Sequence, residues 1–213
     1  MLKISEIFHS ISGESISQGL PAVFLRLAGC NLSCTYCDTE YARHGTYKEF
    51  TIEDAASQCL SFGIPLLIIT GGEPLLQEMA VLQLLQACRS IRSIQLETNG
   101  TMPIDRVVDT CSVVLDVKTP GAGASAPFLT NNLAQLKDTD DIKFVVTDNN
   151  DLSFAAEFSK QYNLFDRPNP PIISPATGYI TPQDAADWLI ETGFSFRLQL
   201  QLHKILWGIK TRR

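Results

Sequence analysis

Residues 22–39 read AVFLRLAGCNLSCTYCDT, and this stretch joins a predicted β-strand to a loop that carries three cysteines. Cys30, Cys34 and Cys37 have C-x3-C-x2-C spacing, which brings three thiols into eight residues. Iron–sulfur clusters are bound by thiolates in compact loops of this kind, and a four-iron cluster normally takes four thiolates. Because the loop supplies three, its spacing indicates a cluster with one iron left for a ligand other than protein.

A structural zinc site is the alternative that the same thiols allow. His44 follows Cys37 by seven residues and could complete a Cys3His site, although zinc fingers usually have a shorter spacing. Three cysteines cannot pair evenly in disulfides, and thiols that only fill an apolar core would not gather in one polar loop. We therefore favour the iron–sulfur cluster over zinc.

The composition is that of an ordinary globular protein, and the length predicts a single domain over residues 1–213. Hydrophobic residues make up 45% of the chain and charged residues 19%, which is enough apolar material for one large core. The formal net charge of −6 disfavours a nucleic-acid partner, because such partners need clustered Lys and Arg. The basic tail Lys210–Arg213 is interpreted as a solvated terminus.

The sequence contains neither a signal-peptide core nor an apolar run as long as a membrane span. We therefore expect a cytoplasmic protein with no membrane partner, in a compartment where thiols stay reduced. The other cysteines are expected to fill the core without forming disulfides, and they are Cys59, Cys88 and Cys111.

Predicted strands and helices alternate along most of the chain. Strands are expected over 22–27, 65–69, 93–97, 112–117, 141–147 and 171–174, and helices over 51–62, 76–89, 104–110, 152–162 and 181–192. Residues 197–203 alternate polar side chains with leucine and are predicted to form the last strand. This order predicts an α/β fold, an incomplete TIM-like barrel of about six parallel strands with outer helices, whose functional residues lie where strands end.

Two predicted strand ends carry residues that point to ligands. Arg26 lies in an otherwise apolar strand, where a guanidinium needs an anion, and either Glu14 or a substrate carboxylate or phosphate could supply it. Gly71-Gly72-Glu73-Pro74 follows the next buried strand. Its glycines would let a ligand approach the backbone closely, and Glu73 offers a carboxylate to a cation.

The cysteine loop and the Gly-Gly-Glu-Pro turn together resemble the radical S-adenosylmethionine (SAM) superfamily, whose members carry both motifs in this order. The resemblance implies that Cys30, Cys34 and Cys37 hold three irons of a [4Fe–4S] cluster and that SAM chelates the fourth. It also implies that reduction of the cluster cleaves SAM to a 5′-deoxyadenosyl radical, which abstracts hydrogen from the substrate.

Within that superfamily the chain is similar to the 7-carboxy-7-deazaguanine synthases. The segments that carry the similarity are Glu6–Phe8, Ser10–Glu14, Arg26–Leu32, Cys37–Thr39, Glu97–Gly100 and Gln201–Lys204 with Trp207. Members are lyases that convert 6-carboxy-5,6,7,8-tetrahydropterin to 7-carboxy-7-deazaguanine with loss of ammonia, on the route to queuosine and other 7-deazapurines. The resemblance therefore implies this activity, a Mg2+ cofactor, an electron donor such as flavodoxin, and a homodimer.

The resemblance also implies roles for individual residues. Arg26 would bind the substrate carboxylate, and Thr39 would coordinate Mg2+ unless its hydroxyl only caps a turn. The other residues that would surround the pterin are Ile11, Ser12, Gly13, Glu14, Thr70, Glu97 and His203. Those that would contact SAM are Tyr36, Cys37, Asp38, Gly71, Gly72, Glu73, Asp116, Val117, Lys118 and Ser174. No catalytic side chain is assigned, because the radical arises at the cluster and SAM.

The chain departs from the family pattern at a few positions, and two other functions stay open. Ser12 and Ser15 stand where glutamine and a second glycine are expected, and Asp116-Val117 replaces Ser-Pro. An activase that installs a glycyl radical on a partner protein would share the cluster spacing but would not explain Arg26. A non-catalytic iron–sulfur or zinc protein would leave the Gly-Gly-Glu-Pro turn without a use.

Overall fold

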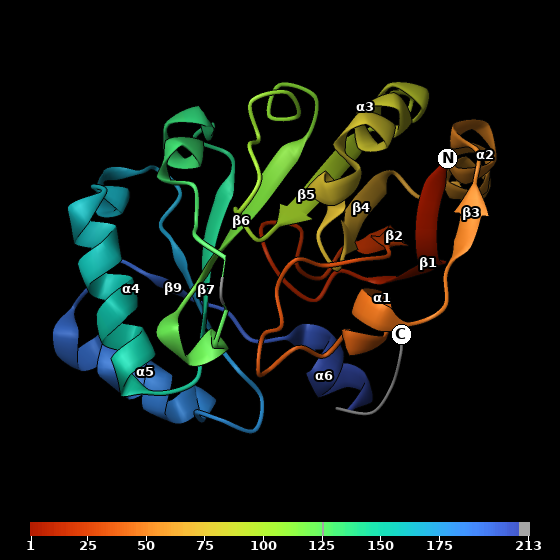
Figure 1. Cartoon of the computed structure of the whole chain (residues 1–213). Helices are drawn as coiled ribbons and strands as arrows, with labels where there is room; N and C mark the ends of the chain where they lie inside the picture. The colour runs from red at the N-terminus through yellow and green to blue at the C-terminus, as the bar shows by residue number, and fades with distance from the viewer. Residues whose placement is uncertain (125, 209–213) are drawn as a thin grey trace.

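The structure is a computed structural model that describes residues 1–124 and 126–208. One nine-stranded sheet runs through these residues in the order β3-β1-β2-β4-β5-β6-β7-β8-β9 (Figure 1). The strands are β1 Leu2–Ile11, β2 Pro21–Leu27, β3 Lys48–Phe50, β4 Leu66–Gly71, β5 Ser93–Thr98, β6 Ser112–Lys118, β7 Asp141–Val146, β8 Ile172–Pro175 and β9 Arg197–Leu198. Neighbours from β2 to β9 are parallel, as predicted, whereas β1 and β3 add antiparallel strands at one edge.

The longer helices flank this sheet, and each begins at a side chain that accepts backbone N–H groups or continues from a short 3-10 turn. They are α2 Ile52–Ser61, α3 Glu78–Ala87, α4 Asn149–Gln161 and α5 Pro182–Thr192. The hydroxyls of Thr51 and Thr181 cap α2 and α5, and α5 also has Pro182 in its first turn. Two short helices, α1 Glu40–His44 and α6 Leu202–Trp207, lie near each other at the end toward which the parallel strands run (Figure 1).

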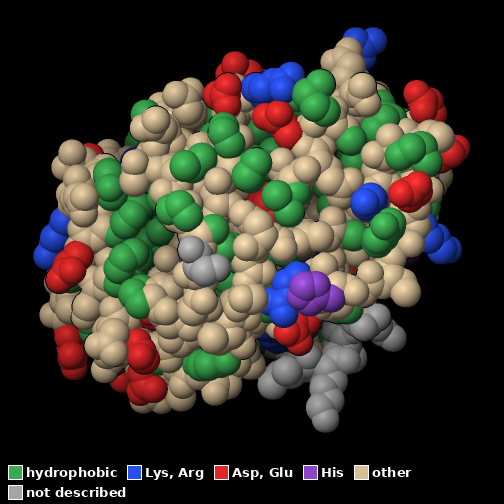
Figure 2. Space-filling view, in the orientation of Figure 1, with side chains coloured by type: hydrophobic (Ala, Val, Ile, Leu, Met, Phe, Trp, Pro, Cys, Tyr) green, Lys and Arg blue, Asp and Glu red, His purple; other side chains and the backbone are tan. Residues whose placement is uncertain are grey.

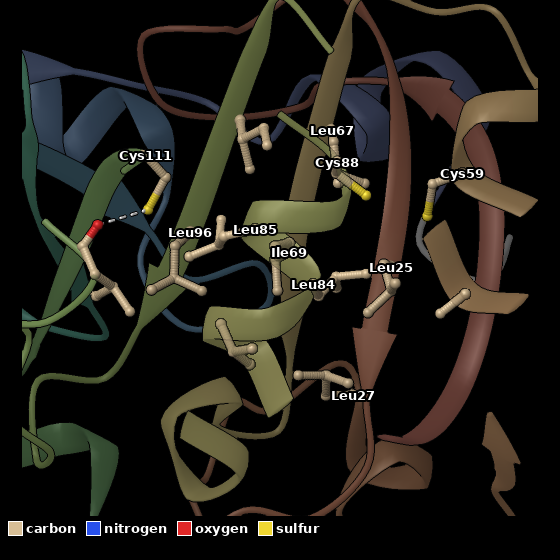
Figure 3. Close-up of a cluster of buried hydrophobic side chains, with 14 of the residues drawn as sticks. Leu25, Leu27, Cys59, Leu67, Ile69, Leu84, Leu85, Cys88, Leu96 and Cys111 are labelled. Carbon is tan, nitrogen blue, oxygen red and sulfur yellow. Dashed lines mark hydrogen bonds between the residues drawn. The ribbon is translucent and has the colours of Figure 1, made fainter. Parts of the chain in front are cut away.

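One face of the sheet forms the main hydrophobic core with α2 and α3 (Figure 3). Leu25, Leu67 and Leu96 are fully buried there, each from a different parallel strand. The same core takes in three cysteines, Cys59, Cys88 and Cys111. Their predicted role as buried filler is confirmed, because all three are free and buried.

The opposite, concave face carries polar side chains, because successive residues of a strand point to opposite faces. Arg26 on β2, Thr70 on β4, Glu97 on β5, Asp116 on β6 and Lys143 on β7 alternate with the core residues of their strands. Arg26 pairs in register with Thr70, and Asp116 pairs in register with Lys143. Parallel pairing therefore aligns a row of polar groups across five strands.

The predicted last strand over 197–203 is wrong beyond its second residue. β9 covers only Arg197–Leu198, and α6 (Leu202–Trp207) follows, so His203 lies on a helix. The neighbouring strand β8 ends at Pro175, which has no N–H with which to continue the ladder. The chain therefore leaves the sheet edge and passes over the concave face.

The predicted helix over 104–110 is also wrong, because this segment forms hydrogen-bonded turns. The N–H groups of Val107 and Val108 both donate to the Ile104 carbonyl at 3.0 Å. The Lys137 ammonium donates to the carbonyls of Val108 and Cys111 at the C-terminal end of this segment.

The surface carries both signs of charge, and on the face drawn in Figure 2 basic and acidic side chains are interspersed. The whole sequence has a formal net charge of −6. No helix within residues 1–124 and 126–208 is long and apolar enough to cross a membrane. The basic tail Lys210–Arg213 lies outside the described residues.

Candidate active site

The concave face of the sheet and the loops at its carboxyl edge enclose a cavity of about 880 Å3. Almost all of the sequence-predicted site residues line it. They are Ile11, Ser12, Gly13, Glu14, Arg26, Cys30, Cys34, Tyr36, Cys37, Asp38, Thr39, Thr70, Gly71, Gly72, Glu97, Asp116, Lys118 and His203. The cavity therefore joins the three thiols to the residues predicted to surround the pterin.

Three predicted residues do not line this cavity: Glu73, Val117 and Ser174, all fully or almost fully buried. Glu73 is not available to a cation, because its carboxylate accepts hydrogen bonds from the Leu75 N–H (2.9 Å), the Thr98 hydroxyl (2.8 Å) and the Asn99 N–H (2.8 Å). Burial raises the pKa of Glu73. Its role here is to tie the Gly-Gly-Glu-Pro turn to the end of β5.

Cys30, Cys34 and Cys37 are free and partly buried at the carboxyl end of β2. Burial raises the pKa of the Cys30 and Cys34 thiols, and bound iron would offset this because a coordinating cation favours the thiolate. Within the described chain, no three or more His, Cys, Asp or Glu side chains are arranged to hold a single metal ion. His44 is exposed at the end of α1, so the zinc alternative gains no support.

The glycines of the Gly-Gly-Glu-Pro turn serve the contact with the cysteine loop. A Cβ on Gly72 would lie 2.0 Å from the Gly29 carbonyl oxygen and 2.8 Å from the Cys30 Cβ. The Glu73 N–H donates to the Gly29 carbonyl at 2.8 Å. Sequence reasoning assigned the glycines to a ligand, whereas the structure shows that backbone packing beside Cys30 also requires them.

Side chains from other strand ends hold the cysteine loop in place. The Asn99 amide donates to Asn31 Oδ1 at 3.0 Å, and the Asn31 amide donates to the Thr101 hydroxyl at 2.7 Å. The Thr35 hydroxyl donates to the Gly121 carbonyl at 2.8 Å. Loops that follow β5 and β6 therefore position a loop that follows β2.

Arg26 pairs with Glu6, and not with Glu14, which was one of the two anion sources that the sequence left open. The Arg26 Nε donates to Glu6 Oε1 at 2.8 Å, and the Tyr41 hydroxyl donates to the same oxygen at 2.5 Å. The Arg26 side chain is only 14% exposed. Its terminal nitrogens make no hydrogen bond within the described chain, so they can bind a carboxylate in the cavity.

Glu14 instead pairs with Lys143, a cavity residue that sequence reasoning missed. The Lys143 ammonium lies 2.6 Å from Glu14 Oε2, and the Gln201 amide donates to Glu14 Oε1 at 2.6 Å. Burial would raise the pKa of Glu14, but these partners lower it to about 2. The sequence feature that could have identified Lys143 is its position within the otherwise apolar stretch of β7. Arg26 was noticed for the same reason.

A second ion pair lies nearer the thiols. The Lys118 ammonium lies 2.8 Å from Asp116 Oδ2 and 5.6 Å from the centre of the Tyr36 ring. Asp116 Oδ1 and the Tyr36 hydroxyl are buried and have no hydrogen-bond partner within the described chain. Burial and the nearby Asp116 carboxylate raise the pKa of Tyr36. These unpaired groups can satisfy polar groups of a ligand beside the cysteines.

Glu97 lies on β5, between Thr70 on β4 and Asp116 on β6 in the row of polar groups. It accepts hydrogen bonds from the Thr70 hydroxyl (2.8 Å) and the Gln95 amide (3.3 Å). Burial raises the pKa of Glu97, and the charge of Glu14 adds to this effect while Lys143 opposes it. The carboxylate can accept hydrogen bonds from adjacent N–H donors of a ligand.

His203 and the loop between β1 and β2 meet at the rim of the cavity. The Leu202 N–H donates to the Gly13 carbonyl at 3.0 Å, and a Cβ on Gly13 would lie 2.1 Å from His203 Nδ1. Lys204 lies 3.0 Å from Asp38 of the cysteine loop. Helix α6 thus brings the predicted histidine to the cavity by a route that the strand prediction did not include.

Ser12 and Ser15, which depart from the family pattern, both help to fix the loop between β1 and β2. The Ser12 hydroxyl lies 2.9 Å from the Ser17 hydroxyl and donates to the Glu14 carbonyl at 3.1 Å. Ser15 has φ of 66°, a left-handed conformation that favours glycine. Its N–H and carbonyl bind the Gln199 side chain at 2.5 and 3.0 Å, which fixes the loop against the end of β9.

Thr39 lies at the start of α1, but its side chain makes no capping hydrogen bond there. Its hydroxyl lies 3.8 Å from the Cys37 sulfur and lines the cavity. The alternative in which Thr39 only caps a turn therefore gains no support. The hydroxyl can face a ligand or a hydrated cation in the cavity.

A model of the radical SAM superfamily matches residues 25–119 of the chain. This range begins within β2 and ends just beyond β6. It contains the cysteine loop, the Gly71-Gly72 turn and the Asp116–Lys118 pair. The match therefore covers the half of the cavity that holds the thiols.

Curated proteins from several organisms match over nearly the whole chain. The 7-carboxy-7-deazaguanine synthase of Koribacter versatilis is 37% identical over 225 residues, covering 99% of this chain and 99% of the relative. That of Methanospirillum hungatei is 38% identical over 208 residues, covering 96% and 85%. The crystal structure of QueE from Escherichia coli gives a TM-score of 0.77 at 25% identity, covering 95% of this chain and 94% of that chain.

Proposed function

The chain belongs to the family of 7-carboxy-7-deazaguanine synthases within the radical SAM superfamily, and from this membership we propose its reaction. It converts 6-carboxy-5,6,7,8-tetrahydropterin to 7-carboxy-7-deazaguanine by ring contraction with loss of ammonia, in queuosine and 7-deazapurine biosynthesis. The observation that carries this proposal is that one cavity joins three thiols to a partly buried arginine and a partly buried carboxylate. We propose that the chain works as one radical SAM domain over residues 1–213.

The donor set beside β2 fits the [4Fe–4S] cluster and SAM that this superfamily uses. Cys30, Cys34 and Cys37 would bind the cluster, and the unpaired Tyr36 hydroxyl and Asp116 Oδ1 would face SAM. When bound, the cluster and SAM together supply a 5′-deoxyadenosyl radical for hydrogen abstraction. The Gly71-Gly72 backbone would border the methionine end of SAM, because it packs directly on the cysteine loop.

The remaining cavity residues fit the pterin. Arg26 would bind the substrate carboxylate through its terminal nitrogens while Glu6 holds its Nε. Glu97 would accept hydrogen bonds from the guanidine-like edge of the pterin, with Thr70 fixing its orientation. Glu14 and His203 would close the pocket from the opposite rim. The cavity then orients the substrate and excludes water from the reacting carbon.

We propose Mg2+ as a further cofactor, with Thr39 as its protein ligand. Mg2+ usually keeps several waters and takes few ligands from protein, so a single hydroxyl is in keeping with its chemistry. The Thr39 hydroxyl makes no capping hydrogen bond, and its position in the cavity supports this assignment. The other ligands would be substrate oxygens and water.

The reaction also needs an electron from outside the chain. Cys59, Cys88 and Cys111 are dispersed in the apolar core, and burial raises the pKa of their thiols to about 12, 11 and 12. None of them can hold a second cluster beside the first. We therefore propose an external donor such as flavodoxin.

We propose that the enzyme acts as a homodimer. Exposed apolar side chains on β9 and α6 support this: Leu198, Ile205 and Leu206 are 37%, 62% and 52% exposed. A second copy covering them would remove apolar surface from water. Sedimentation of the anaerobic protein over a range of concentrations measures the assembly.

The decisive experiment is incubation of the reconstituted, reduced protein with SAM and 6-carboxytetrahydropterin under anaerobic conditions. We expect 7-carboxy-7-deazaguanine and 5′-deoxyadenosine, both detected by mass spectrometry, and stimulation by Mg2+. A Cys34→Ala variant, which cannot complete the cluster, is the matched control and should form neither compound.

Other outcomes separate the alternatives. Formation of 5′-deoxyadenosine without the deazaguanine would refute the synthase assignment while radical SAM chemistry stands, and a glycyl-radical activase would then be tested with partner proteins. Metal analysis tests the non-catalytic alternative, because one zinc per chain without iron would contradict the cluster.

A further inference from the structure

We propose that Lys143 is a positioning residue that holds the Glu14 carboxylate toward the substrate and links it to Asp116 on the SAM side of the cavity. The inference rests on the proposed function for the identity of the two ligands. Neither the sequence motifs nor the family resemblance assigned a role to this lysine. Lys143 is buried, and its ammonium lies close to two carboxylates.

Lys143 lies in the middle of the concave face, on β7. Its side chain is 8% exposed, and its ammonium is 2.6 Å from Glu14 Oε2 and 3.7 Å from Asp116 Oδ2. Asp116 is its direct neighbour in the β6–β7 register, whereas Glu14 comes from the loop after β1. A single ammonium therefore joins a loop near one end of the chain to the centre of the sheet.

Four charges alternate along this line: Glu14, Lys143, Asp116 and Lys118. The successive separations are 2.6, 3.7 and 2.8 Å. The four charges sum to zero, so the line is neutral as a whole although all its members are largely buried. Removing one inner member leaves a buried charge without its partner, which is costly in a site with little water.

The two carboxylates depend on Lys143 to different degrees. Asp116 has Lys118 at 2.8 Å as a nearer partner, so it keeps a counter-charge without Lys143. Glu14 has no other cation at hydrogen-bond distance within the described chain, and its second oxygen receives only the neutral Gln201 amide. Loss of Lys143 should therefore harm binding at Glu14 more than binding at Asp116.

Loss of Lys143 should also change how binding responds to pH. Glu14 faces Lys143 on β7, Glu97 on β5, and Gln201 and His203 at α6, while Asp116 on β6 lies 3.7 Å from the Lys143 ammonium. Without the ammonium, burial and two nearby carboxylates favour the protonated form of Glu14. A protonated Glu14 accepts fewer hydrogen bonds, so substrate affinity should fall further as the pH is lowered.

The test is equilibrium binding to reconstituted holoenzyme that is left unreduced, so that no SAM is consumed. Dissociation constants for 6-carboxytetrahydropterin and for SAM are measured between about pH 6 and pH 8, the range in which a buried carboxyl without its cation can titrate. For Lys143→Met we expect pterin affinity to fall at least about tenfold and SAM affinity by less, about threefold. The pterin loss should grow toward lower pH.

Companion variants keep the proposal testable if Lys143→Met folds poorly. Lys143→Arg retains the charge and should keep pterin affinity within about fivefold of wild type. Lys143→Met combined with Glu14→Gln removes both charges, and its loss should be smaller than the sum of the single losses. Lys48→Met, on an exposed part of β3, is the matched control and should change neither affinity.

Three results would overturn the inference. They are unchanged pterin affinity in Lys143→Met, an equal loss at every pH, and a loss for SAM as large as that for the pterin. Failure of the proposed function looks different, because wild-type holoenzyme would then bind SAM without binding the pterin.

Discussion

Arg26 and Glu6 lie opposite each other in the antiparallel pair β1–β2, and the Arg26 Nε donates a hydrogen bond of 2.8 Å to Glu6 Oε1. The parallel partner of Arg26 on its other side is Thr70. The extra antiparallel strand thus supplies the anion that lets a guanidinium sit inside the sheet. It engages one nitrogen and leaves the terminal pair without a hydrogen bond within the described residues.

Replacing this arginine should separate substrate binding from cluster binding. For Arg26→Ala we expect KM for the pterin to rise at least about thirtyfold, because a bound carboxylate loses its charged partner. Iron content and visible absorbance should stay at wild-type levels, and loss of the cluster would contradict the assignment. Arg106→Ala, which removes an exposed ion pair with Glu78, serves as the control and should leave KM unchanged.

The two groups of cysteines should respond differently to substitution. Cys30→Ala should lose most of the bound iron, since only two protein thiolates would remain for the cluster. Cys88→Ala removes a fully buried sulfur from the core and should keep the iron while lowering stability by about 1 kcal/mol. Iron analysis and denaturant unfolding measure both effects. Equal iron loss in the two variants would contradict the assignment of Cys30 as a cluster ligand.

Gly72→Ala tests the contact between the Gly-Gly-Glu-Pro turn and the cysteine loop. The new Cβ would lie 2.0 Å from the Gly29 carbonyl oxygen, so the backbone beside Cys30 must move. We expect a loss of about 1–3 kcal/mol in stability together with a lower iron content. Gly63→Ala has open space but φ of 66°, and should cost about 1–2 kcal/mol without affecting iron.

Replacing Ser15 by glycine and Ser12 by alanine should change the stability of the protein in opposite directions. Ser15→Gly relieves a left-handed backbone and removes a buried hydroxyl without a partner, so we expect a gain of about 1 kcal/mol, or roughly 2–4 °C in Tm. Ser12→Ala removes two hydrogen bonds and should lose about 1 kcal/mol. Thermal unfolding followed by circular dichroism measures both, and a lower Tm for Ser15→Gly would contradict the strain.

Glu14 should contribute a pH-dependent part of the stability. Its pKa is about 2 in the folded protein against its ordinary 4.5, so the contribution is present above about pH 4.5 and is lost as the pH falls toward 2. It amounts to at most about 3 kcal/mol. The difference in unfolding free energy between wild type and Glu14→Gln should therefore be largest near neutral pH and shrink in acid.

Urea unfolding of iron-free protein at a series of pH values measures this difference, because cluster loss would otherwise add to the acid transition. Glu157→Gln, on the exposed side of α4, should show no such trend. A difference that stays constant down to pH 3 would mean that the ion pair with Lys143 adds nothing to stability in solution.

Sequence patterns located most of the cavity because period and spacing are local properties. The apolar residues around Arg26 revealed a charged side chain within a strand. The turn over residues 71–74 indicated where the next strand ends. The same patterns misjudged residues 197–203, whose alternation suits a strand. That segment lacks a neighbouring strand beyond Pro175, which only the packed sheet reveals.

The sequence by itself determined the cysteine spacing, the alternation of strands and helices, and the family to which the chain belongs. Only the tertiary structure decided which charges meet. Glu6 binds Arg26, Glu14 binds Lys143 across 129 positions of the chain, and Glu73 turns inward to bind the end of β5. The residues next to a carboxylate in the sequence do not show which cation it will pair with. Pairing in a site with little water depends on separations of a few ångströms, which arise only when distant strands share one sheet.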